Sequence, residues 1–205
     1  MKDAAILLAA AVLLEGPAIA ATLDVTVKDA AGAPVQDAVA YALPKSPSVR
    51  PRPPAAIEQR DKTFIPLVSV VQAGTLVSFP NRDEIRHHVY SFSPAKVFEI
   101  KLYAGTAAPT VLFDTPGEVV LGCNIHDHML AYVYVVDTPY FAKSGRDGVA
   151  RIEAPAGDYD VHVWHYAQAA APDAMAARVR ADPVAPPPFV VTLRPQPPRP
   201  RPRPR

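Results

Sequence analysis

The residues best suited to chemistry lie in one short segment, GCNIHDHM, at positions 122–129. It contains the only cysteine of the chain, Cys123, together with His126 and Met129. Copper binds well to a set that combines a thiolate, an imidazole and a thioether. Zinc does not use thioether ligands, and its structural sites carry more cysteines than this chain has. The segment therefore predicts a site for one copper ion.

A copper site of this kind needs a second histidine, because two imidazoles, one thiolate and a weak axial methionine form the blue-copper arrangement. His87 and His88 are the candidates, since they directly precede a predicted strand over 89–92. Neighbouring residues on a strand point to opposite faces, so only one of the two is expected to reach the metal. His162 and His165 lie three positions apart on another predicted strand, face opposite sides and are expected to be structural.

The elements that must position these ligands are short strands. Between residues 64 and 136, apolar runs recur about every ten residues with turn residues between them, which is typical of an all-β sandwich or barrel. In the predicted strand over 118–123, Val119, Leu121 and Cys123 share one apolar face. The cysteine sulfur is therefore expected to point into the core.

The pattern F-x₃-G-x₅-C-x₂-H-x₂-M runs over 113–129, and V-x-F-x-N over 77–81 precedes His87 by six residues. With these motifs, residues 61–137 resemble the amicyanin- and plastocyanin-like cupredoxins, and also proteins described as methylamine-utilisation proteins. The resemblance implies a Greek-key β-sandwich that holds one copper ion as Cu(I) or Cu(II). The ligands it implies are His87, Cys123, His126 and Met129.

The resemblance also implies which residues surround the ligands. His88 stands where cupredoxins usually have an asparagine that holds the cysteine loop, and an imidazole N–H could do the same. Asn81 and Asn124 are the other residues expected directly behind the ligands. The partner is expected to dock on an apolar patch around His126. That patch is expected to contain Ile125, His128 and Pro94.

These residues predict a one-electron carrier rather than an enzyme. Three strong ligands and a weak axial one leave no clear open position for a substrate, which favours outer-sphere electron transfer. The expected partner is a redox protein such as a cytochrome or a dehydrogenase. Two alternatives stay open: a copper-binding or copper-delivery protein, and a structural, ligand-presenting β-module in which the metal is stabilising.

The flanks of the predicted copper domain carry a second set of strand signals. The pattern V-x-D-x-x-G-x-P-V at 27–35, together with Asp147-Gly148 and PAGDY at 155–159, resembles carboxypeptidase-regulatory, transthyretin-like β-sandwiches. The resemblance implies a discontinuous, immunoglobulin-like sandwich from residues 22–43 plus 138–193. The alternative is one enlarged cupredoxin with extra strands. An alanine-rich stretch at 167–181 is expected to form one short helix.

The amino-terminal residues 1–20 read as a signal peptide. An apolar run at 4–14 follows Lys2, and Ala18-Ile19-Ala20 is a small-x-small cleavage site. The run is too short to span a bilayer, and no other stretch of the sequence could cross one. We therefore expect a periplasmic protein, where metal binding explains a lone cysteine in an oxidising compartment.

Proline and charge define two further segments. Residues 44–60 are proline-rich and are expected to form an exposed linker. Residues 194–205 alternate proline and arginine, which predicts a disordered, cationic, polyproline-like tail. This tail is expected to contact an acidic partner or an anionic surface. The body of the chain is mildly acidic, so nothing in it predicts nucleic-acid binding.

Overall fold

The computed structural model describes five ranges of the chain, and every regular element within them is a β-strand. These ranges are 20–45, 53–105, 108–169, 176–180 and 187–195. The all-β fold expected from the sequence is thus confirmed. Within these ranges, no helix has the length and apolar character needed to cross a membrane. Most of the expected signal peptide and of the cationic tail lies outside the described residues.

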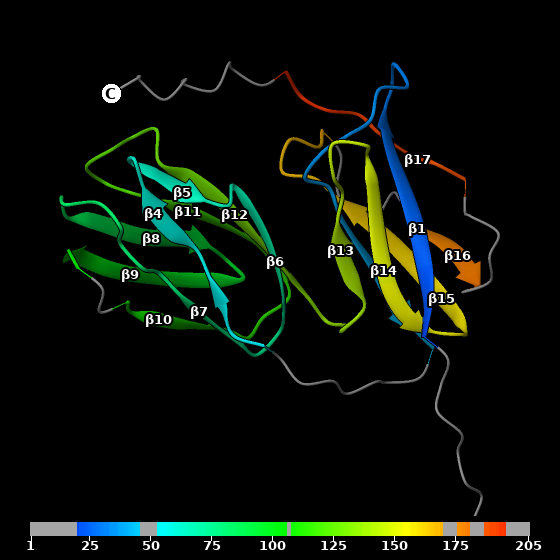
Figure 1. Ribbon diagram of the computed structural model, residues 1–205, viewed down its shortest axis with the longest axis horizontal. Coiled ribbons are helices and arrows are strands. Elements are labelled where there is room, and N and C mark those ends of the chain that lie inside the picture. The colour runs from blue at the N-terminus through cyan, green and yellow to red at the C-terminus, as the bar shows by residue number, and fades with distance from the viewer. Residues whose placement is uncertain (1–19, 46–52, 106–107, 170–175, 181–186, 196–205) are drawn as a thin grey trace, which may run out of the picture.

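The strands form two groups that lie side by side (Figure 1). The group on the right of the figure is built from both ends of the described chain and contains two sheets, with orders β14-β1-β17 and β13-β2-β15-β16. Its strands are β1 (Ala20–Asp29), β2 (Val39–Pro44), β13 (Phe141–Lys143), β14 (Val149–Pro155), β15 (Asp158–Trp164), β16 (Ala176–Arg180) and β17 (Phe189–Val191).

Alternation of apolar residues explains why this group packs as a sandwich. Leu23, Val25 and Val27 of β1 are buried on one face, where they meet Ile152 of β14 and Val161 of β15. Burying each such side chain stabilises the fold by roughly 1.5–3 kcal/mol. The resulting hydrophobic cluster joins residues that lie more than a hundred positions apart in the sequence.

The group on the left of Figure 1 is formed by the middle of the chain. It contains a five-stranded sheet of order β6-β12-β11-β8-β9, a three-stranded sheet of order β10-β7-β3 and the hairpin β4-β5. Its strands are β3 (Ala55–Ala56), β4 (Glu58–Arg60), β5 (Thr63–Ile65), β6 (Val68–Gln72), β7 (Thr75–Ser78), β8 (His87–Ser93), β9 (Lys96–Tyr103), β10 (Thr110–Phe113), β11 (Gly117–Gly122) and β12 (Leu130–Val136).

This second group has its own hydrophobic core, in which the largest fully buried side chains are Phe64, Phe79 and Phe113. Cys123 and Met129 belong to the same cluster. The inward-facing residues of β11 and β12 alternate with outward-facing ones, as expected for a sheet with one face against the core. The core therefore extends to the segment that carries the predicted copper ligands.

A third apolar cluster joins the two groups. The outward face of β12 contributes Tyr134 and Val136, and the other group contributes Val39 and Trp164. The rings of Tyr134 and Trp164 stack with centroids 4.6 Å apart, and Trp164 Nε1 donates a hydrogen bond of 3.1 Å to Glu118 Oε2. One half of the outer face of the five-stranded sheet is thus covered by the neighbouring sandwich.

Two expectations about local structure are wrong. Residues 46–52 of the exposed linker predicted over 44–60 lie outside the described residues, and the part after them is not exposed, because Ile57 and Gln59 are fully buried in the second group of strands. The helix predicted over 167–181 is replaced, at Ala176–Arg180, by strand β16, which pairs with β15. The pairing partner outweighs the helix propensity of alanine in that segment.

Candidate metal centre

Cys123 directly follows strand β11, and its side chain lies in the interior. Val119 and Leu121 are fully buried, and Cys123, which continues their face, is only 3% exposed. The chain then turns, and the N–H of Met129 donates a hydrogen bond of 2.9 Å to the carbonyl of His126. This turn closes the loop between β11 and β12 and brings the His126 ring back toward the sulfur. The inward orientation of Cys123 expected from the sequence is confirmed.

A separate loop positions His87, which begins β8 and is fully buried. Asn81 organises this loop: its side-chain oxygen accepts the N–H of Asp83 at 2.9 Å. Its side-chain amide donates to the carbonyls of Ile85 at 2.8 Å and Tyr103 at 3.1 Å. Asn81 therefore fixes the loop that leads to His87, and its expected place directly behind the ligands stays a prediction.

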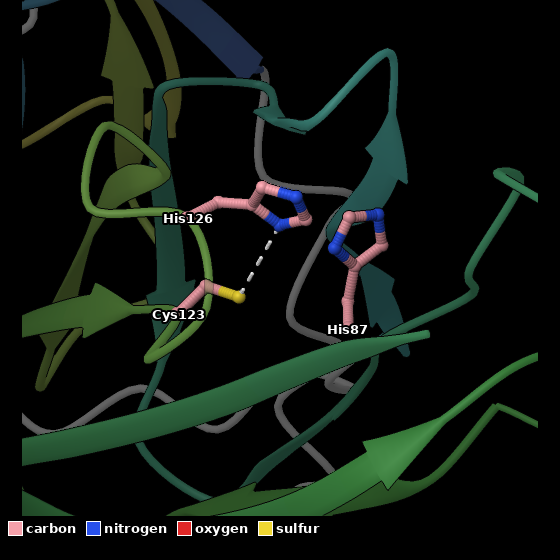
Figure 2. Close-up of side chains that lie close together, drawn as sticks. All are labelled: His87, Cys123 and His126. Carbon is pink, nitrogen blue, oxygen red and sulfur yellow. Dashed lines mark hydrogen bonds between the residues drawn. The ribbon is translucent and has the colours of Figure 1, made fainter. Parts of the chain in front are cut away.

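Three side chains converge on one point (Figure 2). The ligand atoms of His87, Cys123 and His126 all lie within 4.8 Å of one another, and Cys123 Sγ is 4.0 Å from His126 Nδ1. Ligand atoms at about 2.0–2.3 Å from a shared ion lie no more than about 4.6 Å apart. The cluster is therefore close to the size that a single ion requires.

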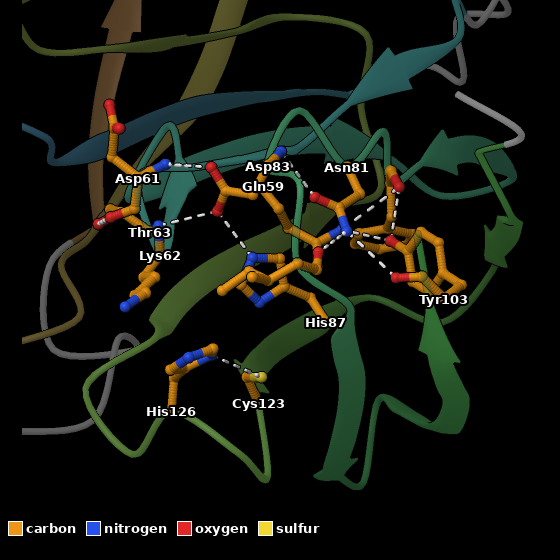
Figure 3. A network of polar contacts seen from close by, with 12 residues as sticks. Gln59, Asp61, Lys62, Thr63, Asn81, Asp83, His87, Tyr103, Cys123 and His126 are labelled. Carbon is orange, nitrogen blue, oxygen red and sulfur yellow. Dashed lines mark hydrogen bonds and ion pairs between the residues drawn. The ribbon is translucent and has the colours of Figure 1, made fainter. Parts of the chain in front are cut away.

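The carboxylate of Asp83 fixes the orientation of His87 (Figure 3). His87 Nε2 lies 2.7 Å from Asp83 Oδ2. Because an ionised carboxylate only accepts hydrogen bonds, Nε2 must carry the proton and Nδ1 must keep a free lone pair. His87 Nδ1 is buried and has no hydrogen-bond partner among the described residues. A buried, unpartnered lone pair beside a thiol and a second imidazole is the environment that a bound copper ion would complete.

The hairpin β4-β5 holds Asp83 in turn. The same carboxylate accepts the N–H groups of Asp61 at 2.7 Å and Lys62 at 3.0 Å. Asp61 and Lys62 are the two turn residues and have φ angles of 52° and 54°, as a type I′ hairpin requires. Burial alone would raise the pKa of Asp83. The hydrogen bonds from Lys62, His87 and Asp61 outweigh that effect and leave the pKa below its usual value.

The surroundings of His126 favour its neutral form. Burial lowers the pKa of His126, electrostatic repulsion from His87, Lys62 and His128 lowers it further, and Asp83 opposes the shift. A neutral imidazole is the form that binds a metal. His126 is the more exposed of the two histidines, and the ring centroids of His126 and His87 are 5.1 Å apart.

A buried polar network lies behind the site, and the sequence analysis did not find it. The Tyr103 hydroxyl donates to the carbonyl of Phe79 at 2.6 Å and accepts a hydrogen bond from Gln59 Nε2. Burial raises the pKa of Tyr103 to about 12. The hydrogen bond from Gln59 lowers this pKa, and the charge of Cys123 raises it further. Asp83 was also missed. Its position four residues before His87 is the one signal that could have indicated it.

Met129 is 1% exposed and packs in the same apolar cluster as Cys123. It follows His126 by three residues, and its backbone bonds to the carbonyl of that histidine. The structure thus places Met129 in the core directly beyond the loop. Its role as the axial ligand stays a prediction.

Two of the residues expected behind the ligands lie elsewhere. His88 points away from the cysteine loop, and its Nε2 pairs with Glu99 Oε1 at 2.9 Å. The expectation that His88 replaces the family's asparagine is therefore wrong, because neighbouring residues at the start of β8 face opposite sides. Asn124 is exposed in the turn that follows Cys123.

Two of the three residues expected in the docking patch lie together in the loop between β11 and β12. Ile125 and His128 are exposed there, and the rings of His128 and His126 are 6.0 Å apart. Pro94 is not part of this patch. It lies in the β8-β9 turn beside Ala95, which meets Gly117 at the far end of β11. That end is roughly 20 Å from Cys123 at the usual rise per residue of a strand.

The remaining histidines have other environments. His165 Nε2 lies 3.2 Å from the carbonyl of Gln36, and its Nδ1 accepts the N–H of Ala167. His162 stacks on Tyr41 with ring centroids 5.1 Å apart. Neither belongs to the metal-ligating cluster found among the described residues.

No family model matches the chain, and no curated protein matches it. The solved structures that this chain resembles include copper proteins with a cupredoxin fold. One is the copper-containing nitrite reductase of Thermus scotoductus SA-01, with 22% identity and a TM-score of 0.40 over 48% of this chain and 25% of the reductase.

Two others are small proteins. The purple cupredoxin of Nitrosopumilus maritimus is 21% identical, with a TM-score of 0.37 over 40% of this chain and 99% of that one. An amicyanin variant in its oxidised state is 19% identical, with a TM-score of 0.37 over 40% of this chain and 82% of that one. The assignment of the site therefore rests on the residues of this chain.

Proposed function

We propose that this chain is a periplasmic type 1 copper protein that carries single electrons between redox partners by outer-sphere transfer. The observation that carries the proposal is the buried, unpartnered Nδ1 of His87, which lies beside a thiol and a second imidazole. When bound, copper supplies one-electron exchange between Cu(I) and Cu(II). The ion would be held by His87, Cys123 and His126, with Met129 as the weak axial ligand.

The scaffold suits fast electron exchange. His87 is oriented by Asp83, Cys123 is fixed by β11, and His126 is held by a short closed turn. Ligands attached to paired strands and to a buried hydrogen-bond network move little, so little reorganisation opposes the transfer of an electron. This support favours a carrier rather than a site that must open for a substrate. The chain is accordingly proposed not to be an enzyme.

The exposed edge of His126 is the proposed route of the electron to the partner. His87 and Cys123 are buried, whereas His126 is partly exposed and is flanked by the exposed residues Ile125 and His128. A small apolar contact around an imidazole edge is sufficient for the weak, short-lived complexes that redox proteins form. The partner is proposed to be a redox protein such as a cytochrome or a dehydrogenase.

The sandwich formed by the flanks is proposed to be a separate module, residues 22–43 plus 138–193, into which the copper domain is inserted. Its hydrophobic cluster contains residues from both flanks, and the copper-domain cluster contains residues from the middle of the chain.

The expected signal peptide supports a periplasmic location, as does a single cysteine kept from oxidation by the metal.

Copper delivery is the second candidate function, because His128 is exposed with its ring 6.0 Å from that of His126. Two neighbouring imidazoles near the surface could pass the metal to an acceptor. A delivery protein would transfer copper to a chelating acceptor within minutes and exchange electrons slowly with a cytochrome. A carrier would do the reverse, and the burial of Cys123 and His87 favours this outcome.

The deciding experiment is the optical spectrum of the copper-loaded protein. We expect an intense visible thiolate-to-copper(II) band, which disappears in Cys123→Ala. His162→Ala is the matched control: its ring lies outside the cluster, so that variant should keep the band. A colourless full chain after loading with Cu(II) would contradict the proposal.

A further inference from the structure

An apolar groove crosses the outer face of the five-stranded sheet, beside the cysteine loop. Its volume is about 260 Å³, and it is lined by Tyr90, Phe92, Val120, Gly122 and Leu130, among others. Phe92 is 80% exposed. The Tyr90 ring lies over Gly122, where a Cβ would come within 2.7 Å of Tyr90 Cζ. The floor of the groove therefore depends on a glycine next to Cys123.

The groove continues an existing interface. Cross-strand pairing places Val120 beside Tyr132 and Gly122 beside Leu130 on β12. Tyr132 is already covered, because its ring stacks on Tyr166 of the neighbouring sandwich with centroids 4.7 Å apart. The same sheet face is thus covered on the β6-β12 side and open on the β11-β8 side.

The described chain leaves the sandwich at the border between these two halves. The N–H of Arg194 donates to the carbonyl of Ala167 at 2.8 Å, and Arg194 Nη2 donates to the carbonyl of Tyr166 at 3.4 Å. Tyr166 stacks on Tyr132, which pairs with Val120 in the groove. Arg194 thus contacts the residue whose ring stacks on Tyr132, the cross-strand neighbour of the groove residue Val120.

Ten further residues follow this point, Gln196–Arg205, of which five are proline and four are arginine. In an extended polyproline conformation, ten residues reach about 30 Å. That length is ample to cross four strands spaced at about 4.8 Å. Proline-rich segments bind in grooves lined by aromatic side chains, and Tyr90 and Phe92 provide two rings with centroids 5.0 Å apart.

Charge favours the same contact. The four arginines of this segment leave 17 basic and 20 acidic residues in the rest of the chain. Glu99, paired across strands with Tyr90, and Glu118, two residues before Val120, are both exposed beside the groove. Arginine also binds favourably over tyrosine and phenylalanine rings.

We infer that the segment Gln196–Arg205 folds back along this groove, with its prolines on Tyr90 and Phe92 and its arginines near Glu99 and Glu118. Bound there, it covers the side of the sheet next to Cys123 and leaves the edge of His126 as the open route to the site. The inference does not depend on the proposed electron-transfer function.

The test compares amide NMR spectra of the full chain and of a chain that ends at Pro195. The amides of Val120, Gly122 and Leu130 should differ between the two. A synthetic peptide of residues 194–205, added to the shortened chain, should restore the full-chain positions in a saturable way. Raising the salt to 0.5 M should weaken the peptide's binding several-fold, because exposed charge pairs are screened.

Phe92→Ser should remove the difference between the two chains without unfolding the protein, because Phe92 is exposed. Leu76→Ser is the matched control: Leu76 is 52% exposed on β7 in the other sheet, so that variant should keep the difference. Identical spectra of the two chains would overturn the inference. So would shifts that map to the sandwich, or groove shifts that grow with protein concentration in both chains, which would indicate a second copy.

Discussion

Asp83 lies four residues before His87 and accepts a hydrogen bond from its Nε2 at 2.7 Å. This contact decides which nitrogen of His87 is free to bind a metal. The same carboxylate is held by the turn of the β4-β5 hairpin, so the hairpin, the carboxylate and the ligand form one chain of support. Asp83 thus sets the orientation of the proposed ligand His87 from behind its ring.

Asp83→Asn should lower the affinity for copper by about 10–100-fold, because an amide orients the imidazole less firmly than a carboxylate does. Competition with a chelator of known affinity measures the effect. Asp114→Asn is the control, since Asp114 is exposed and pairs with Lys96 instead. An unchanged affinity in Asp83→Asn would show that the contact is structural only.

The lowered pKa of Asp83 predicts a pH dependence of stability. Because the folded-state pKa lies below the unfolded value of about 3.9, the carboxylate stabilises the fold above that pH. This contribution disappears as the pH falls through the lowered folded-state pKa. In urea unfolding of the metal-free chain, Asp83→Asn should show a smaller loss of stability on acidification than the parent chain. An equal loss in both would contradict the prediction.

Tyr103 should ionise at about pH 12, because burial and the charge of Cys123 disfavour the phenolate. Its raised pKa contributes stability below pH 10 that is lost as the pH rises through 12. Tyr103→Phe should remove the late phase of an ultraviolet titration and destabilise the fold by about 1–3 kcal/mol, since Phe79 and Gln59 lose their partner. Tyr90→Phe should keep the late phase.

Met129→Leu should show whether Met129 only packs in the core or also binds the metal. Leucine fills a similar volume, so the free energy of unfolding of the metal-free chain should change by less than about 1.5 kcal/mol. If the thioether is the axial ligand, voltammetry should show a clear rise in the reduction potential, because a weak donor to Cu(II) is lost. An unchanged potential would leave Met129 as a core residue alone.

The contact between the two groups of strands can be followed through Trp164, the one tryptophan of the chain. Glu118→Ala leaves its buried indole N–H without an acceptor and should destabilise the contact by about 1–3 kcal/mol. Tryptophan emission during urea unfolding should then change at a lower denaturant concentration. Glu118→Gln keeps a side-chain oxygen and should behave nearly as the parent chain.

Local pattern was sufficient for most strands in the middle of the chain. Apolar runs about every ten residues, with turn residues between them, predicted a series of strands between residues 64 and 136, where the structure has β6 to β12. Short or atypical strands were missed, among them β4, β5 and β16, because their sequences lack a repeated apolar pattern. These strands form only because a partner lies beside them, as β15 does for β16.

The sequence by itself predicted the kind of site, because residue type sets metal preference and the spacing of Cys123, His126 and Met129 fits one loop. Only the tertiary structure showed that His87 lies beside Cys123 and His126. It also showed that Asp83 orients His87 and that His88 pairs with Glu99. It also showed that Pro94 lies near the far end of β11 and not beside His126. The physical reason is that such contacts depend on strand pairing between distant segments, which local pattern does not encode.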